Sequence, residues 1–305
     1  MPRRCEEVAP PAALEPLKRS LIQKLTFLKA DSILVFVCGA KPSTAVPGAR
    51  DRLVQYAQRY LKHFQFFMAE DVFKALVADS NRDLLSIEAS LADLSDCIII
   101  ILESEGAFAE LGAFTVRDDL AGIVLAINDI EHRGGDSFLS LGPLAKLEKK
   151  KFGPVIYGNL KSVLSTIPAI EQRLSKIKRT YNKRLDMSTS TAFHNRSAKH
   201  RALFIHDLLR VFAPLKKKDL AAILNTLYSS SSVDVEFELA LLEALRLIKR
   251  TNASYLLPTT PPGALFFEYH GFDVAKARSA ALNHYHKYQP LRCRELASQV
   301  ARLNA

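Results

Sequence analysis

The segment 103–114 holds the residues best suited to nucleophilic chemistry. It reads Glu103-Ser104-Glu105-Gly106-Ala107-Phe108-Ala109-Glu110-Leu111-Gly112-Ala113-Phe114. Gly106 permits a tight turn and the close approach of a ligand. Glu110 is expected in the first turn or so of a following helix, where the helix macrodipole favours the ionised carboxylate that a nucleophile needs. The pattern therefore indicates covalent catalysis by Glu110, although acidic residues in a first helical turn are also ordinary partners of the dipole.

Three further acidic residues are candidates for a ligand site near Glu110. Glu70 and Asp71 follow a candidate strand at 63–68, and Glu88 falls on the edge of an apolar helical stripe. Carboxylates that converge on one edge of a sheet cost free energy unless they serve a ligand or have cationic partners. For each of the three taken singly, a surface salt bridge or a helix cap is an equal alternative.

The elements that must position these residues alternate between strand and helix. Strands are predicted at 32–38, 63–68, 96–102 and 121–127, with helices at 50–64, 81–94 and 107–116. This alternation predicts an α/β fold, a Rossmann- or flavodoxin-like parallel sheet with helices on both faces. Ligands of such sheets collect where strands end and helices begin. Cys38, Gly39, Ser104 and Gly106 are therefore candidate substrate-binding residues.

The remainder of the chain is predicted to be mainly helical. An amphipathic helix is expected at 12–28, a basic helical connector at 161–184, and three helices at 199–212, 216–228 and 233–249, before a short hairpin. Three helices and a hairpin are the order of a winged helix-turn-helix, although any small helical domain can show three amphipathic helices. The predicted domains are an N-terminal helical segment (1–30), an α/β domain (31–158), a basic helical connector (159–198) and a winged-helix domain (199–305).

The charge of the chain is unevenly distributed. Residues 1–150 contain 18 Lys and Arg against 21 Asp and Glu, whereas residues 151–305 contain 24 against 11, so the net charge of +10 arises in the second half. A cationic surface attracts polyanions, which indicates a nucleic-acid partner and says nothing about fold. The candidate contacts at helix starts are Lys199, Arg201, Lys216, Lys217 and Lys218, and a solvated helix face is an equal alternative for the last three.

Several classes of protein are disfavoured. The most apolar stretch, 97–102, has six residues, far from the roughly 20 that span a bilayer. The four cysteines, Cys5, Cys38, Cys97 and Cys293, form no Cys-x-x-Cys pair, which argues against zinc and disulfides and for a reduced, cytoplasmic setting. The eight histidines show no metal-ligand spacing, so no metal is expected.

Five motifs in order carry a resemblance to a known family. They are Val35-Phe36-Val37-Cys38-Gly39, Ala69-Glu70-Asp71-Val72-Phe73, Leu84-Leu85-Ser86-Ile87-Glu88, the Glu103–Phe114 segment, and Ser137-Phe138-x-x-x-Gly142-Pro143. Together they resemble the nucleoside deoxyribosyltransferase-like effectors, or toxins, of bacterial retron anti-phage systems. In those effectors such a domain precedes a winged-helix domain. The resemblance covers most of residues 30–150, and for 160–305 it rests on the order of elements.

The resemblance implies an N-glycosidase that acts on a nucleotide. In the wider family the glutamate of the Glu-Leu-Gly motif, here Glu110, attacks the anomeric carbon of the sugar and forms a glycosyl-enzyme ester. Related effectors are associated with NAD cleavage, which makes NAD the expected substrate and implies no separate cofactor. The implied partners are the retron reverse transcriptase and its RNA–DNA hybrid (msDNA), in a homo-oligomer or larger assembly. Two positions depart from the pattern. Retron relatives commonly have Ser-Pro-Gly where this chain has Ser104-Glu105-Gly106, and the wider family often has an aspartate at the position of Ser104 to handle the base.

A second hypothesis needs no catalysis. The α/β domain would only sense a nucleotide, and the winged helix would bind an operator, which would make the chain a transcription regulator. Nicotinamide in NAD is already a cationic leaving group, so cleavage of NAD tolerates the missing aspartate, and the enzyme hypothesis stands with Ser104 as it is.

Overall fold

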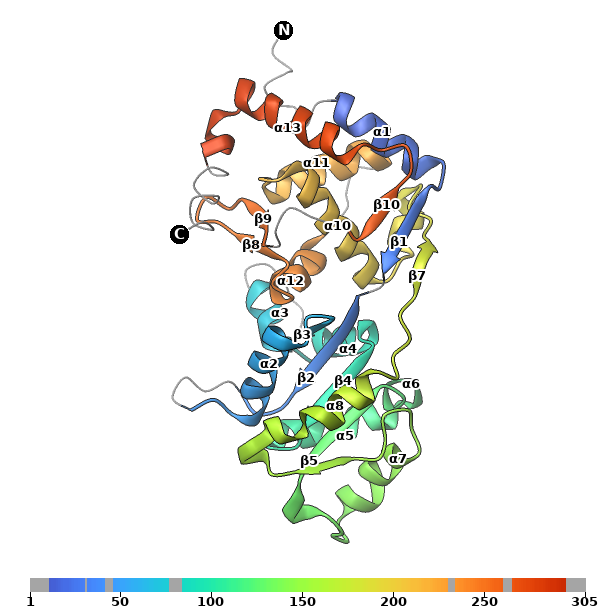
Figure 1. Cartoon of the computed structure of the whole chain (residues 1–305), viewed down its shortest axis with the longest axis vertical. Helices are drawn as coiled ribbons and strands as arrows, with labels where there is room; N and C mark the ends of the chain where they lie inside the picture. The colour runs from blue at the N-terminus through green and yellow to red at the C-terminus, as the bar shows by residue number, and fades with distance from the viewer. Residues whose placement is uncertain are drawn as a thin grey trace. The chain divides into compact units, whose positions relative to one another are not determined.

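The computed structural model describes residues 11–30, 32–41, 46–76, 84–229, 234–259 and 265–294. The chain forms two compact units. The sheet unit contains residues 32–179, and the helical unit contains residues 1–31 and 180–305. The helical unit is therefore assembled from both ends of the chain (Figure 1).

A parallel sheet forms the centre of the sheet unit. Its strands are β2 (Ile33–Cys38), β3 (Phe64–Phe67), β4 (Cys97–Ile101), β5 (Val124–Asp129) and β6 (Ile156–Gly158). They lie in the order β3-β2-β4-β5-β6, and every neighbouring pair is parallel. In chain order this is the 2-1-3-4-5 arrangement of flavodoxin-like sheets, whose ligands bind where the first and third strands diverge. The α/β prediction is confirmed.

Helices cover both faces of this sheet. They are α2 (Ala49–Tyr60), α3 (Ala69–Leu76), α4 (Leu84–Leu94), α5 (Glu105–Val116), α6 (Asp118–Ala121), α7 (Ala145–Glu148) and α8 (Ile167–Leu174), with short turns η2 (Ile130–His132), η3 (Ser140–Leu144) and η4 (Leu160–Thr166). Val35 and Val37 pack into a core with α2 and α8. Phe36 faces the other side, where its ring lies 6.4 Å from that of Phe114 on α5. All six residues of β2 are buried, as expected for a central parallel strand.

The helical unit combines a small antiparallel sheet, a hairpin and helices. Its elements are α1 (Pro11–Ile22), β1 (Thr26–Ala30), β7 (Tyr181–Arg184), α9 (Ser190–His194), α10 (Ala198–Phe212), α11 (Lys217–Tyr228), α12 (Glu236–Ala244), β8 (Ile248–Arg250), β9 (Leu256–Pro258), β10 (Phe267–Tyr269) and α13 (Val274–Tyr288). The three-stranded sheet has the order β10-β1-β7, and β8 pairs with β9. Helix α1 packs on α13, and α10 packs on both α12 and α13.

Three predicted helices in this region end too late. The helix predicted at 12–28 stops at Ile22, because Lys24 has a positive φ of 56° and the following residues form β1. The helix predicted to reach residue 249 ends at Ala244, where Arg246 also has a positive φ, of 55°. The connector predicted to stay helical through Arg184 ends instead in strand β7. Each error arises where a short strand follows a helix, which helical periodicity does not reveal. Strands β1 and β7 pair with each other across the chain, whereas β8 pairs with the neighbouring strand β9.

The winged-helix domain stays a prediction. Helices α10, α11 and α12 and the β8–β9 hairpin follow in that order, and Leu215 forms an isolated antiparallel bridge with Leu256. The unit boundaries differ from the predicted domain boundaries, because residues 159–179 belong to the sheet unit and residues 180–198 to the helical unit. With these boundaries the sheet unit has 18 basic and 18 acidic residues, whereas the helical unit has 24 and 14. The net charge of +10 therefore belongs entirely to the helical unit.

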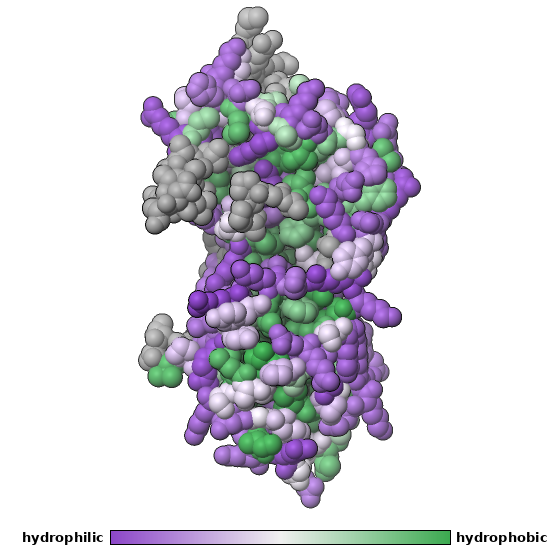
Figure 2. All heavy atoms as spheres, in the orientation of Figure 1, coloured by the Kyte–Doolittle hydropathy of each residue, from purple (hydrophilic) through white to green (hydrophobic). Residues whose placement is uncertain are grey.

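The surface of both units is mainly hydrophilic on the face drawn in Figure 2, with hydrophobic residues exposed between the polar ones. Among the helices of the described segments, none combines the length and apolarity that a bilayer crossing requires.

Candidate active site

The connection from β4 to α5 is fixed by a helix cap. The Oγ atom of Ser104 accepts a hydrogen bond from the backbone N–H of Ala107 at 3.3 Å, with Ser104 in an extended conformation. Helix α5 therefore begins at Glu105, two residues earlier than predicted, and Gly106 lies within its first turn. Glu110 consequently lies in the second turn, beyond the unpaired N–H groups of the helix start.

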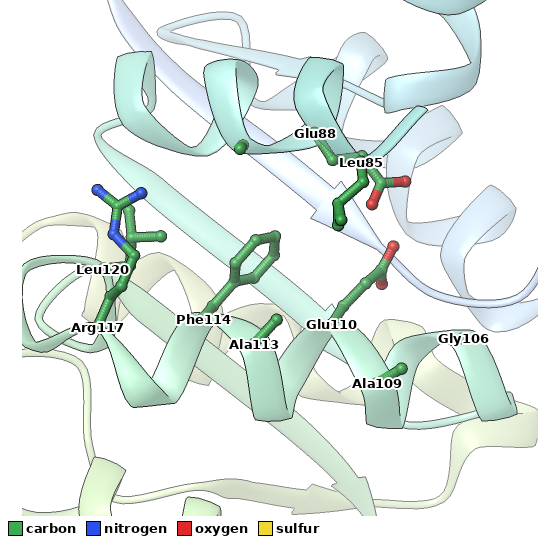
Figure 3. A pocket seen from close by; sticks show the side chains of 10 residues that line it. Leu85, Glu88, Gly106, Ala109, Glu110, Ala113, Phe114, Arg117 and Leu120 are labelled. Carbon is green, nitrogen blue, oxygen red and sulfur yellow. The ribbon is translucent and has the colours of Figure 1, made fainter. Parts of the chain in front are cut away.

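A pocket of about 470 Å³ opens beside α4 and α5, within the ~300–1,000 Å³ that is typical of small-molecule sites. Its lining residues are Leu85, Glu88, Ala89, Gly106, Ala109, Glu110, Ala113, Phe114, Arg117 and Leu120. Figure 3 shows the side chains of Glu88 and Glu110 at one end of the pocket, with Phe114 in the middle and Arg117 at the other end. The pocket thus has a carboxylate end and an apolar middle.

The carboxyl groups of Glu88 and Glu110 point toward one another from α4 and α5 (Figure 3). Burial raises the pKa of Glu110 to about 7, and the negative charges of Glu88 and Glu70 act in the same direction. A hydrogen bond with the Cys38 thiol and the charge of Arg50 oppose the rise. Burial, followed by the charge of Glu70, also raises the pKa of Glu88. Both carboxyl groups therefore hold a proton more readily than an ordinary glutamate does.

The expected effect of the helix macrodipole on Glu110 is wrong. The dipole acts within the first turn, and Glu110 lies in the second. Burial and like charges dominate instead, so the pKa of Glu110 is raised and not lowered. One of its oxygens, Oε2, is buried and has no hydrogen-bond partner among the described residues.

Cys38 contacts Glu110 at the end of β2. The Cys38 side chain is 1% exposed, and burial raises the pKa of its thiol well above the usual value. Cys38 therefore keeps its proton and can donate a hydrogen bond to the Glu110 carboxylate. Its described contact is with the candidate nucleophile, whereas the sequence suggested contact with a substrate.

Glu70 and Asp71, adjacent on α3, have different partners. The Oε1 atom of Glu70 lies 2.9 Å from Nη2 of Arg50, a guanidinium buried in the sheet unit. Asp71 instead pairs with Lys74, one turn further along the same helix, at 3.6 Å. The structure thus places Glu70 among the charged residues that act on Glu110. The described contact of Asp71 is a surface ion pair.

Glu103 is a residue of the site that the sequence did not single out. Its carboxylate accepts hydrogen bonds from the backbone N–H groups of Ala40 at 3.2 Å, Ala49 at 2.9 Å and Arg50 at 3.0 Å. It therefore caps the start of α2 from the end of β4 and ties that helix to the loop after β2. Its position directly after a central strand, next to Ser104, was the available signal.

Gly39 is expected to accommodate a side chain poorly. A Cβ atom there would lie 3.0 Å from Cβ of Arg50 and 3.0 Å from Oε1 of Glu103, a tight contact that neighbouring atoms must shift to relieve. Gly39→Ala should therefore lower the free energy of unfolding by about 1–3 kcal/mol, measured by chemical denaturation. Gly112→Ala is the matched control, because a Cβ at Gly112 meets no atom within 4 Å. It should be neutral or stabilising by up to about 1 kcal/mol, and equal losses in both variants would contradict the close packing at Gly39.

The predicted nucleic-acid contacts lie in different environments. Lys199 is 6% exposed, and Arg201 pairs with Glu238 at 2.6 Å. The Lys216 ammonium lies 4.9 Å from the centroid of the Tyr255 ring, and Lys217 pairs with Glu236. Lys218 is exposed at the start of α11. Of the five, Lys218 offers its charge most directly to a polyanion.

No group of three or more His, Cys, Asp or Glu side chains is arranged to hold a metal ion within the described parts of the chain. Cys38, Cys97 and Cys293 are free thiols, and Cys5 lies outside the described residues.

The sequence is similar to a retron effector family and to two retron proteins. The family model described as "STM3845 retron effector protein" matches residues 48–250. An Escherichia coli retron Ec73 protein, whose name proposes a ribosyltransferase and DNA-binding role, is 30% identical over 285 residues, which cover 85% of this chain and 87% of that protein. An Escherichia coli retron Ec86 protein with the same proposed role is 34% identical over 118 residues, 38% of each chain. The chain therefore belongs to the STM3845 retron effector family.

Proposed function

We propose that this retron effector is an N-glycosidase that cleaves the bond between ribose and nicotinamide in NAD, with Glu110 as the nucleophile. The observation that carries the proposal is the state of Glu110, a carboxyl group in a pocket with a pKa of about 7 and one unpaired, buried oxygen. A perturbed carboxyl group in a pocket is characteristic of catalytic sites. The ribosyltransferase role that the names of both relatives propose supports the same class of reaction.

The reaction would proceed in two displacements. An oxygen of ionised Glu110 attacks the anomeric carbon of the ribose, and the bond from that carbon to the pyridinium nitrogen breaks. The electron pair stays with the nitrogen, so nicotinamide leaves as a neutral molecule and an ADP-ribosyl ester remains on Glu110. Water then attacks the same carbon, the ester carboxylate departs, and a proton of the water passes to Glu88 and on to solvent. The products are ADP-ribose, nicotinamide and one proton.

The composition of the pocket suits this leaving group. Ala109, Ala113 and Phe114 supply an apolar surface beside the carboxylates, which fits an aromatic ring that becomes uncharged as it leaves. The carboxylates attract the positive pyridinium ring before cleavage. Because the departing base needs no proton, the site requires no aspartate at the position of Ser104, whose side chain caps α5.

The rate of NAD cleavage is expected to rise with pH through about 7. The nucleophile acts only when ionised, and the pKa of Glu110 is raised to about 7. The value of kcat/KM, which reports the free enzyme, should fall about tenfold per pH unit below that point and level off above it. Nicotinamide release by the purified protein, followed by chromatography between pH 5.5 and 9, measures this. A rate that is independent of pH over that range would contradict Glu110 as the nucleophile, and intact NAD at every pH would favour the nucleotide-sensing regulator.

The helical unit is proposed to dock on nucleic acid. Its net charge of +10 supports attraction to a polyanion, and the DNA-binding role proposed in the names of both relatives supports the same conclusion. The proposed partners are the reverse transcriptase of the retron and its RNA–DNA hybrid, in a cytoplasmic assembly with one or more copies of the chain. Docking through a winged helix would hold the sheet unit as an inactive toxin until infection.

Lys218→Gln is expected to weaken binding to an RNA–DNA hybrid and to reduce the slope of log K against log salt by about 1, because one phosphate contact is lost. Fluorescence anisotropy across a salt titration measures the slope. Lys276→Gln, at an exposed position on α13, is the matched control and should leave the slope unchanged. If both variants retain the wild-type slope, the start of α11 is not part of the contact surface.

A further inference from the structure

Arg50 is a buried cation in the middle of the acidic site. The residue is 3% exposed, and its Nη2 atom lies 2.9 Å from Oε1 of Glu70. Its Nε atom has no hydrogen-bond partner among the described residues. Burying a guanidinium costs several kcal/mol unless opposite charges compensate for the lost water. The negative charge of the neighbouring carboxylates compensates for this cost.

The backbone around Arg50 is held rigidly. Glu103 accepts a hydrogen bond from the Arg50 backbone N–H and another from that of Ala49, which fixes the first turn of α2. The side-chain stem of Arg50 packs against Gly39, where an added Cβ would lie 3.0 Å from Cβ and 3.2 Å from Cδ of Arg50. Gly39 directly follows Cys38, which contacts Glu110. The stem is thus locked next to the residue that touches the candidate nucleophile.

Three titratable groups interact with the Arg50 side chain, namely Cys38 at the end of β2, Glu70 on α3 and Glu110 on α5. Glu103 accepts a hydrogen bond from the Arg50 backbone, and Glu88 on α4 is the further acid whose charge acts on Glu110. Arg50 is the cation whose attraction to both Glu110 and Cys38 opposes the effect of burial within the described residues. Three of the acids, Glu70, Glu88 and Glu110, repel one another across this space.

We infer that Arg50 is the positioning residue of the active site: its buried guanidinium anchors Glu70 and offsets the negative charge around Glu110, which favours the ionised carboxylate. This inference depends on the proposed function only for the reaction that the ionised Glu110 carboxylate carries out. Arg50 acts through Glu110 and needs no contact with the substrate. Without the guanidinium, the Cys38 thiol alone would oppose burial, Glu88 and Glu70, so Glu110 would hold its proton to a higher pH.

An electrostatic role and a structural role of Arg50 predict different pH profiles. If Arg50 only supported the fold, Arg50→Gln would lower kcat/KM by one factor at all pH values. The electrostatic role predicts instead a shift of the whole pH profile upward by about one unit or more. The variant should then lose about tenfold at pH 6.5 and recover most of its activity at pH 9.

The test is a carbon-13 NMR titration of the side-chain carboxyl groups, with Glu110→Gln used to identify the signal of Glu110. The midpoint for Glu110 should lie near 7 in the wild type and rise by about one unit or more in Arg50→Gln. Arg59→Gln, which changes an exposed arginine on the same helix, is the matched control and should leave the midpoint unchanged. A folded Arg50→Gln protein with the wild-type midpoint would overturn the inference.

Glu70→Gln provides a second, independent variant in case Arg50→Gln does not fold. It removes one negative charge that acts on Glu110 and leaves the Arg50 charge without its partner, so the midpoint should fall. An unchanged or raised midpoint would count against the role of Arg50. These titrations need no substrate, so they remain decisive even if NAD is not cleaved, in which case the proposed function fails and the inference about Arg50 is judged separately.

Discussion

Glu110→Gln is expected to reduce NAD cleavage by about 10³-fold or more while the protein stays folded. The amide has the shape of the carboxyl group but cannot form the glycosyl ester, so the first displacement has no nucleophile. Nicotinamide release under saturating NAD is the measurement. Glu105→Gln is the matched control, because Glu105 is an exposed glutamate at the start of the same helix and should leave the rate within a factor of about two.

The free energy of unfolding of Glu110→Gln distinguishes the loss of the nucleophile from the loss of the fold. The pKa of Glu110 is about 7 in the folded protein and near the ordinary 4.5 in the unfolded chain. A raised pKa contributes stability that is fully present below pH 4.5 and is lost as the pH rises through 7. Glu110→Gln carries no such charge, so its advantage in free energy of unfolding over the wild type should grow between pH 5 and pH 8, on the order of 1–3 kcal/mol.

A covalent intermediate gives the clearest view of the mechanism. Rapid acid quench of the wild type during turnover, followed by mass spectrometry, should find an ADP-ribosyl group on the peptide that contains Glu110. Glu110→Gln that cleaves NAD at the wild-type rate would refute this role. An active wild type with no such adduct, together with an inactive variant, would indicate direct attack by water with Glu110 as its base.

Local sequence patterns predicted the skeleton of this site but not its electrostatics. The continuous apolar run at 33–38 and the isoleucine-rich run at 97–101 identified two central strands, since strands buried on both faces have little choice of residue type. The rule that ligands bind where strands end then led to Glu110 and to its neighbours Gly106 and Cys38. These inferences use only residues close together in the chain and one general property of parallel sheets.

The charge balance could not be predicted, because it depends on burial and on residues from separate elements. The macrodipole argument considered the helix of Glu110 alone, whereas burial raises the pKa of Glu110, and the charges of Glu88 and Glu70 on two other helices add to that rise. Arg50 begins an ordinary amphipathic helix and reads as a surface residue until the structure shows it buried. The cap that Glu103 forms on α2 joins residues more than 50 positions apart, and no local pattern reveals it.

The fold of the helical unit was harder still to predict from the sequence, because its sheet joins segments from both ends of the chain. Strand β1 at 26–30 pairs with β10 at 267–269 and with β7 at 181–184. Each strand has three to five residues, too few to establish an alternating pattern. The N-terminal segment therefore looked like a separate helical piece, although it supplies the central strand of this sheet.

Asp207 on α10 is expected to be essential for holding that sheet in place. The residue is 1% exposed. Its carboxylate accepts hydrogen bonds at 2.9 Å from the backbone N–H groups of Phe266 and Phe267 and at 3.1 Å from the hydroxyl of Tyr269. Burial, together with the negative charge of Asp207, raises the pKa of Tyr269 well above its usual value, so the hydroxyl remains a donor. One side chain thus secures the strand that pairs with β1.

Asp207→Ala should therefore lower the free energy of unfolding of the helical unit by about 3–5 kcal/mol. Three buried donors lose their acceptor, at about 1–3 kcal/mol for each group left unpaired, with partial relief from water that enters the space. Asp207→Asn should fall between the wild type and alanine, because its amide keeps one acceptor oxygen but directs an NH₂ group at a donor. Guanidinium denaturation followed by circular dichroism measures both losses.

A helix cap at the surface provides a control for the stability loss expected of Asp207→Ala. Asp273 accepts a hydrogen bond from the Lys276 backbone N–H at 2.9 Å and caps α13, so Asp273→Ala should cost only about 1 kcal/mol. Hydrogen exchange should also distinguish the two variants, with amides of β1 losing protection in Asp207→Ala and keeping it in Asp273→Ala. If the two alanine variants are equally stable, β10 is held by its pairing with β1 and by side-chain packing, and the carboxylate of Asp207 is dispensable to the fold.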